Sequence, residues 1–190
     1  MSNGSFSLGK FYKDSKQTLF RPKAYFPDME VSGGLGEPIL KALSYGVIAG
    51  IFILIWSLLD IIGITTGSYS GNDAVIGFFS TIGGAVVGVF IAALIIMILS
   101  YICSGNKNYE ANTRVAAAIM VVLPVSVILG VFSGISYALG AVIALIVHLY
   151  GVYMLYNALV STLKGDKKPA RAISYILGVL LVIVAIIGLV

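Results

Sequence analysis

The chain has 190 residues, of which 59% are hydrophobic and only 11% are charged. A soluble domain carries roughly 25% charged residues, so these charges are too few to cover a water-exposed surface, and the composition indicates an integral membrane protein. The net charge is +4. In membrane proteins an excess of Lys and Arg marks the loops on the cytoplasmic side, so this charge does not argue for nucleic-acid binding.

Residues 1–37 form a polar cytoplasmic segment, in which the run FSLGKFYKDSKQTLFRPKAYF mixes aromatic with basic side chains. A helix over this run would place Leu8, Phe11, Tyr12, Ser15 and Leu19 on one face. We predict a short amphipathic helix on an anionic inner leaflet, serving as an orienting anchor or as a docking and lipid-sensing element. The candidate membrane-surface or partner-docking residues are Lys10, Phe11, Lys13, Lys16, Arg21 and Lys23.

Residues 38–190 contain five apolar segments, each long enough to cross a bilayer as about 20 helical residues. The segments are 38–64, 74–103, 115–132, 135–163 and 170–190. The sequence therefore predicts an all-α bundle of five transmembrane helices. Pro124 predicts a kink in the third helix. The third and fourth helices, joined by little more than residues 133–134, should form an antiparallel hairpin.

The basic residues indicate how this bundle is oriented. All 12 Lys and Arg residues fall on one side of a five-span arrangement, and four or six spans would break this segregation. Under the positive-inside rule that side is cytoplasmic. We expect a multi-pass protein of the inner or plasma membrane, with its N-terminus in the cytoplasm and its C-terminus outside.

Three polar residues within or near the predicted spans are candidate functional groups, namely Asp60, His148 and Tyr150. An ionisable residue inside a membrane is a functional candidate by default. A neutral His148 could instead be satisfied by a backbone carbonyl or a Tyr hydroxyl. These residues leave open a polar path for a small transporter or channel subunit.

The turn GGLGEPIL, residues 33–40, precedes the first span. It lacks the Lys and Ser/Thr that a phosphate-binding Walker loop requires. Its glycines permit a tight turn, Pro38 suits the first turn of a helix, and Glu37 lies near the positive end of that helix's dipole. The stretch is therefore interpreted as an entry turn.

Together with the upstream RPKAYFPDMEV, this turn resembles the Yip-domain family (Ypt-interacting proteins, membrane partners of Rab-type GTPases). The run NYEANTRVAAAIMVVLP resembles the family pattern of a Tyr and an Arg entering the third span, with a Pro inside it. The residues that carry the resemblance are Gly33, Gly34, Gly36, Pro38, Tyr109, Arg114 and Pro124. The short N-terminal segment resembles prokaryotic members, which weighs against a GTPase partner.

The chain offers little material for catalysis. The spans lack a nucleophile–base–acid set and paired carboxylates, and the lone Cys103 cannot build a metal cluster. We expect no enzyme activity, no cofactor and no metal. Small residues recur every fourth position at 46/50, 80/84/88 and 130/134, a spacing that packs helices within one chain or between copies of a homo-oligomer.

The function favoured by these features is a non-catalytic membrane scaffold or adaptor in membrane organisation or a trafficking-like process. Its partners would be the bilayer, through anionic inner-leaflet lipid, and a protein. The alternatives are the transporter or channel subunit with a polar path near His148 and, less favoured, a lipid-handling protein.

Overall fold

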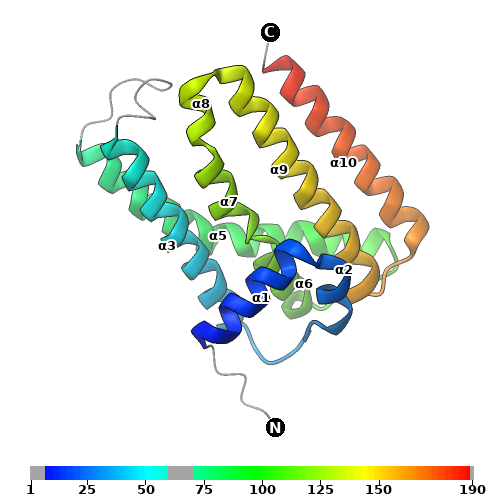
Figure 1. Ribbon diagram of the computed structural model, residues 1–190. Helices are drawn as coiled ribbons and strands as arrows, with labels where there is room; N and C mark the ends of the chain where they lie inside the picture. Colours follow the sequence, from blue (N-terminus) through cyan, green and yellow to red (C-terminus); the bar gives the residue numbers. More distant parts are fainter. Residues whose placement is uncertain (1–6, 60–70, 189–190) are drawn as a thin grey trace.

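The structure is a computed structural model and describes residues 7–59 and 71–188. Of the described residues 85% are helical, and no strand occurs among them. Five helices among the described residues are long and apolar enough to cross a membrane. They span Gly36–Leu58, Ala74–Ile102, Tyr109–Ile135, Tyr137–Thr162 and Lys167–Ile187. The predicted all-α, multi-pass membrane architecture is confirmed (Figure 1).

The first two spans, α3 (Gly36–Leu58) and α5 (Gly71–Ile102), form a closely packed antiparallel pair. Glycines of α3 make this approach possible. A Cβ atom on Gly46 would lie 2.9 Å from a side-chain carbon of α5, and one on Gly50 would lie 2.8 Å from the ring of Phe78. The small-residue spacing of α3 therefore serves packing within the chain.

The third span is broken into α6 (Tyr109–Ile119), α7 (Val122–Leu129) and α8 (Val131–Ile135). The break between α6 and α7 comes just before Pro124, as expected, because proline has no N–H to offer the carbonyl four residues earlier. That carbonyl, of Met120, accepts at 2.9 Å from the residue that precedes the proline.

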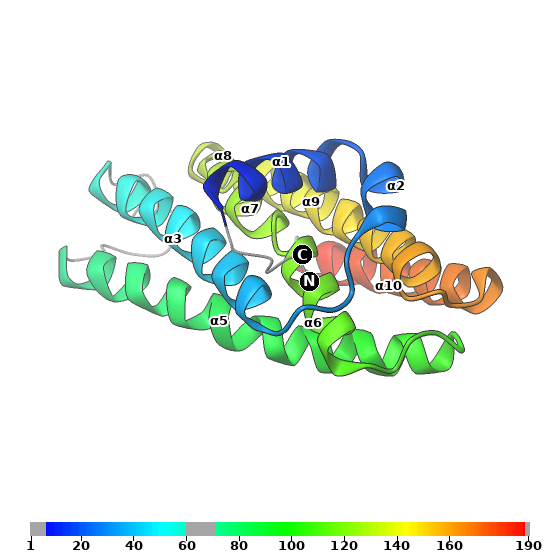
Figure 2. The same cartoon turned by 90° about the horizontal axis from the view of Figure 1, so that it is seen from below.

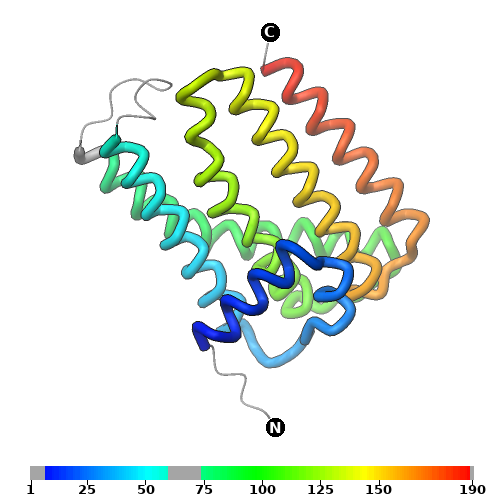
Figure 3. Tube along the Cα trace, in the orientation of Figure 1, coloured from blue at the N-terminus to red at the C-terminus, as the bar shows by residue number. Residues whose placement is uncertain are grey.

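The last two spans are α9 (Tyr137–Asn157), extended by a π-helical turn, and α10 (Lys167–Ile187). The hairpin between the third and fourth spans is confirmed. Its turn lies at Ser136, a few residues later than predicted, because the Ser136 hydroxyl caps α9. In Figures 1 and 3, α7, α9 and α10 lie side by side.

Two connections interlock at the end of the bundle where α5 stops and α10 starts. The N–H of Asn106 donates to the carbonyl of Leu163, and the N–H of Asp166 donates to the carbonyl of Cys103, both at 2.7 Å. A Cβ atom on Gly165 would lie 2.9 Å from that of Cys103. This close approach fixes the end of α5 against the start of α10.

The N-terminal segment folds over the same end of the bundle as α1 (Leu8–Phe20), α2 (Pro22–Tyr25) and the 3₁₀ turn η1 (Phe26–Asp28). Ser7 caps α1 by accepting from the N–H of Lys10 at 3.1 Å. Figures 1 and 2 show α1 crossing the face formed by α3, α7 and α9. We call α1, α2 and η1 the N-terminal cap.

Phe26 anchors the cap to the bundle. Its side chain is fully buried, and its carbonyl accepts from the Thr162 hydroxyl at 2.6 Å. Beneath it lies α6, whose residues 111–118 are all buried. Small side chains on α6 let the cap, α3 and α5 meet around it. The longest buried stretch among the described residues therefore lies at the cap end.

The predicted face of α1 is divided in the structure. The ring of Phe11 lies 5.0 Å from that of Tyr45, and the Ser15 hydroxyl lies 2.8 Å from the Tyr45 hydroxyl. By contrast, Leu8 and Tyr12 are 75% and 68% exposed. These four residues lie on one face of the helix, as the spacing predicts, but Tyr45 of α3 contacts only the part of that face that carries Phe11 and Ser15.

Candidate functional site

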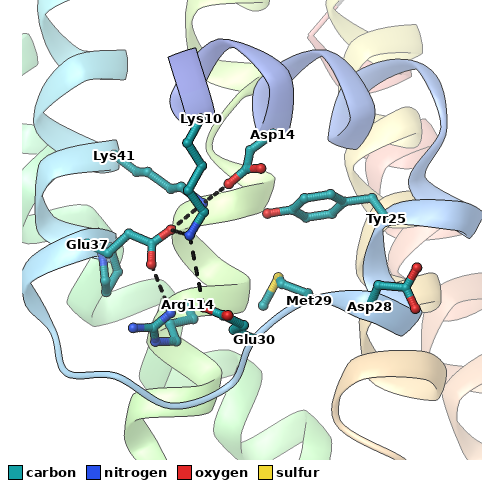
Figure 4. A pocket seen from close by; sticks show the side chains of 10 residues that line it. Lys10, Asp14, Tyr25, Asp28, Met29, Glu30, Glu37, Lys41 and Arg114 are labelled. Atoms are coloured by element: carbon teal, nitrogen blue, oxygen red, sulfur yellow. Dashed lines mark hydrogen bonds and ion pairs between the residues drawn. The ribbon is translucent and has the colours of Figure 1, made fainter. Parts of the chain in front are cut away.

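A buried carboxylate, that of Glu37, lies at the centre of a charged cluster between the cap and the bundle. Its side chain is 8% exposed, and its oxygens lie 3.2 Å from Lys10 Nζ, 3.0 Å from Lys41 Nζ and 3.1 Å from Arg114 Nη1. Figure 4 shows these three cations, from α1, α3 and α6, directed toward the carboxylate. Glu37 also lies in the first turn of α3, where the helix dipole favours a negative charge.

Further ion pairs extend this cluster. Lys41 Nζ lies 2.9 Å from Asp14 Oδ2, which ties α3 to α1. Arg114 Nε lies 3.5 Å from Glu110 Oε1, and Lys10 Nζ lies 3.9 Å from a carboxylate oxygen of Glu30. We call these seven residues the Glu37 cluster: Lys10, Asp14, Glu30, Glu37, Lys41, Glu110 and Arg114.

The glycine turn before α3 is held by the same cluster. Gly33 and Gly34 have φ values of 123° and 88°, which favour glycine. The carbonyl of Gly34 accepts from Arg114 Nη2 at 3.2 Å, and its N–H donates to Glu110 at 2.5 Å. A Cβ atom on Gly33 would lie 2.8 Å from Arg114 Nη2. The turn is therefore shaped to receive the arginine of the third span.

A cavity of about 180 Å³ lies beside Glu37 and is lined by both charged and uncharged groups. Tyr25, Asp28 and Met29 form its other side, as Figure 4 shows. Burial raises the pKa of the Tyr25 phenol, although the nearby Lys41 opposes this shift. The phenol is therefore a neutral wall of the cavity at physiological pH.

The residues that carry the family resemblance are only partly brought together. Gly36 and Pro38 lie in the first turn of α3, next to Gly33, Gly34 and Arg114. Tyr109 donates its hydroxyl to the carbonyl of Phe90 at 3.3 Å, and Pro124 is buried at the break in the third span. The last two position helices and do not line the Glu37 cavity.

The six candidate docking residues separate into four groups. Lys10 belongs to the Glu37 cluster, and Phe11 packs on Tyr45. Lys13, Lys16 and Arg21 are exposed on the cap. Lys23 is also exposed, but it lines a separate groove beside α9 and α10.

The candidates for a polar path do not converge. Asp60 lies outside the described residues. His148 is exposed on α9, and its Nδ1 lies 2.6 Å from the Ala144 carbonyl of the same helix. Tyr150 donates its hydroxyl to the carbonyl of Leu19 in the cap. His148 and Tyr150 therefore serve different contacts.

Sequence reasoning missed four members of the cluster, namely Asp14, Glu30, Lys41 and Glu110. Two of the pairs had a readable signal, since Glu37 and Lys41, like Glu110 and Arg114, are an acid and a base four residues apart on a helix. Lys41 also lies near the start of an apolar span, and a charged residue there indicates that it has a partner of opposite charge. Asp14 likewise follows Lys10 by four residues on α1, but the structure pairs it with Lys41, 27 residues away.

Comparison with known proteins gives one family. The family model of the Yip1 domain matches residues 16–189, nearly the whole chain. No match was found among curated proteins or among solved structures.

Proposed function

Because this chain belongs to the Yip1 domain family, we propose that it is a non-catalytic membrane scaffold or adaptor and that its N-terminal cap is a docking platform for a protein partner. The observation that carries this proposal is the attachment of the cap to the bundle. Three basic side chains from α1, α3 and α6 share the carboxylate of Glu37. A platform that is already ordered loses less conformational entropy when it binds a partner.

Other bonds support a rigid cap. Thr162 donates to the carbonyl of Phe26, Tyr150 donates to that of Leu19, and Ser15 meets Tyr45. These bonds attach the cap to α3, to α9 and to the π-helical turn that follows α9. The cap therefore offers a defined surface rather than a loose tail.

The exposed side of α1 has the composition of a binding surface. Tyr12 and Phe20 are 68% and 72% exposed, and Lys13, Lys16 and Arg21 are exposed beside them. Aromatic and arginine side chains are enriched among the residues that dominate binding energy in protein interfaces. We infer that an acidic surface of a protein partner docks here.

The proposal of a non-catalytic role rests on how the acids are used. Glu37 is occupied by three cations and Asp14 by Lys41. A general base needs a carboxylate that is free to accept a proton from a substrate. These carboxylates instead join helices.

The orientation follows from the positive-inside rule. The cap, the α5–α6 connection and the α9–α10 connection lie at one end of the bundle, and the end of α10 lies at the other (Figure 1). Since the basic residues belong to the former, we propose that the cap end is cytoplasmic and that the C-terminus lies outside an inner or plasma membrane.

The test compares two variants with equal loss of charge. One replaces Lys13, Lys16 and Arg21 by Gln, and the control replaces Lys107, Lys167 and Lys168, which are exposed on the same side. Each protein is extracted from its own membrane into nanodiscs, and its stoichiometry is measured by native mass spectrometry. We expect a stoichiometric protein partner whose occupancy falls about tenfold in the cap variant and stays unchanged in the control.

Either of two results would overturn the adaptor proposal. The wild-type particle could contain only copies of this chain, which would leave α1 as a surface anchor. Alternatively, the two triple variants could lose the partner equally, which would show that general charge and not the cap surface holds it.

A further inference from the structure

A groove of about 740 Å³ runs along the outer surface between α9 and α10, away from the Glu37 cluster. The α10 residues that line it are spaced three and four apart from Arg171 to Ile183. The α9 residues from Leu149 to Tyr156 have the same spacing. Such spacing places each set on one face of its helix, so the groove is a continuous channel between two facing stripes.

One end of the groove is polar and positively charged. Lys23 reaches it from α2, and Arg171 and Ser174 from the first two turns of α10. No ion pair joins Lys23 or Arg171 to a carboxylate of the described residues. The hydroxyl-bearing residues at this end are Tyr153, Tyr156, Ser174 and Tyr175. The Ser174 hydroxyl donates to the carbonyl of Ala170 at 2.9 Å, so the tyrosine hydroxyls are the donors that can join the two basic groups in a site for a phosphate.

The remainder of the groove is apolar. It is lined by Leu149, Val152, Gly178, Val179, Val182 and Ile183. Gly178 leaves this part of the groove open. A Cβ atom there would meet only Leu149, at 3.6 Å, so a larger side chain at this position would have to extend into the groove. Val179 and Val182 remain 58% and 37% exposed, so this part is open to an apolar occupant from the bilayer.

The length of the groove matches one leaflet. From Arg171 to Ile183 there are twelve residues, or about 18 Å of helix at 1.5 Å per residue. Half of a hydrocarbon core about 30 Å thick is roughly 15 Å. An occupant with its phosphate at Arg171 would therefore end its acyl chain near the bilayer midplane, beside Ile183.

We propose that this groove binds one anionic phospholipid of the adjacent leaflet. The phosphate lies between Lys23 and Arg171, the tyrosine hydroxyls and Ser174 surround the glycerol region, and one acyl chain follows the apolar stripe past Gly178. Lys23 thereby links the cap to the lipid, because α2 continues directly from α1. The site is separate from the proposed protein-docking surface, which uses Lys13, Lys16 and Arg21.

The test is a lipid titration of purified, delipidated protein in detergent, followed by native mass spectrometry. The probes are phosphatidylglycerol and phosphatidylcholine with identical acyl chains. We expect one phosphatidylglycerol to bind about tenfold more tightly than phosphatidylcholine. Arg171→Gln and Lys23→Gln should each remove most of this preference, and the control Lys168→Gln, an exposed lysine one turn away on α10, should keep it.

A second variant tests the apolar part independently. Gly178→Phe fills the channel and should reduce binding of both lipids about tenfold or more, with thermal unfolding measured to confirm that the bundle remains folded. If this variant unfolds, the Gln variants still decide the matter. Equal affinity for the two lipids, or a preference that survives Arg171→Gln, would overturn the proposal.

Discussion

Glu37 is the residue on which the cap depends most, because one carboxylate compensates three positive charges from three helices. Lys41 and Arg114 are 8% and 7% exposed. Removing one partner of a buried ion pair is costly chiefly because the remaining charge stays buried without compensation. A neutral residue at position 37 would leave Lys41 with Asp14 alone and Arg114 with the longer contact to Glu110 alone.

We therefore expect Glu37→Gln to lower the free energy of unfolding by on the order of 3 kcal/mol and to loosen the cap. The measurement is reversible unfolding in detergent, together with protease sensitivity of the cap. Glu30→Gln is the matched control, since Glu30 also pairs with Lys10 but is 70% exposed. Exposed pairs contribute about 1 kcal/mol or less. Similar losses in the two variants would contradict the central place given to Glu37.

At this scale the sequence supports only local inferences. It places Glu37 at the start of a helix and Lys41 four residues later, which is enough to predict one pair. It cannot place Arg114, which is 77 residues away along the chain. The positive φ of Gly33 was expected of a tight turn, but its physical cause, the close approach of the Arg114 guanidinium, depends on how α6 packs.

At the scale of helices, hydropathy and length were sufficient to predict five spans, since the bilayer imposes both. Pro124 also located the break in the third span. What the apolar face of α1 contacts was not predictable in the same way. Tyr45, which meets Phe11 and Ser15, is 30 residues beyond Ser15 along the chain and is brought to α1 only by the fold.

Small-residue spacing alone could not distinguish packing within the chain from packing between copies. The structure separates the two cases. Gly46 faces α5, where a Cβ atom would lie 2.9 Å from Ala85 Cβ and 3.0 Å from Ile82 Cα. Gly84 and Gly88 have no such neighbour within 4 Å. The same motif therefore has different consequences in α3 and in α5.

This difference predicts opposite effects of the same substitution. Gly46→Ala should destabilise the bundle by about 1–3 kcal/mol, because the backbone of α5 must move to admit a methyl group. Gly84→Ala should leave stability unchanged or raise it by up to about 1 kcal/mol, as alanine does in a helix interior. Both are measured as the free energy of unfolding in detergent.

A substantial loss of stability in Gly84→Ala would contradict the packing described here. If that loss depended on protein concentration, it would instead place Gly84 at a contact between copies of the chain, as the small-residue spacing also allows.

At the scale of the whole molecule, the two ends of the bundle are chemically different. The cap end has the ion pairs of the Glu37 cluster and the interlocked connections before α6 and α10. The opposite end has the turn at Ser136, with no Lys or Arg in the residues that join α8 to α9. Under the positive-inside rule this asymmetry supports the proposed orientation, whereas the helices alone would fit a bilayer either way.

The proposed orientation predicts which engineered thiols an impermeant maleimide can reach. The natural Cys103 should react little with the maleimide. It is fully buried, and burial raises the pKa of its thiol, which disfavours the reactive thiolate. Ser136→Cys and Lys168→Cys place exposed thiols at opposite ends. In intact cells we expect labelling of Ser136→Cys alone, and of Lys168→Cys only after the membrane is permeabilised. The reverse labelling pattern would show that the protein has the opposite orientation, with the cap outside. Labelling of both thiols in intact cells would mean that the chain inserts in two orientations, and then the charge asymmetry would not determine its topology.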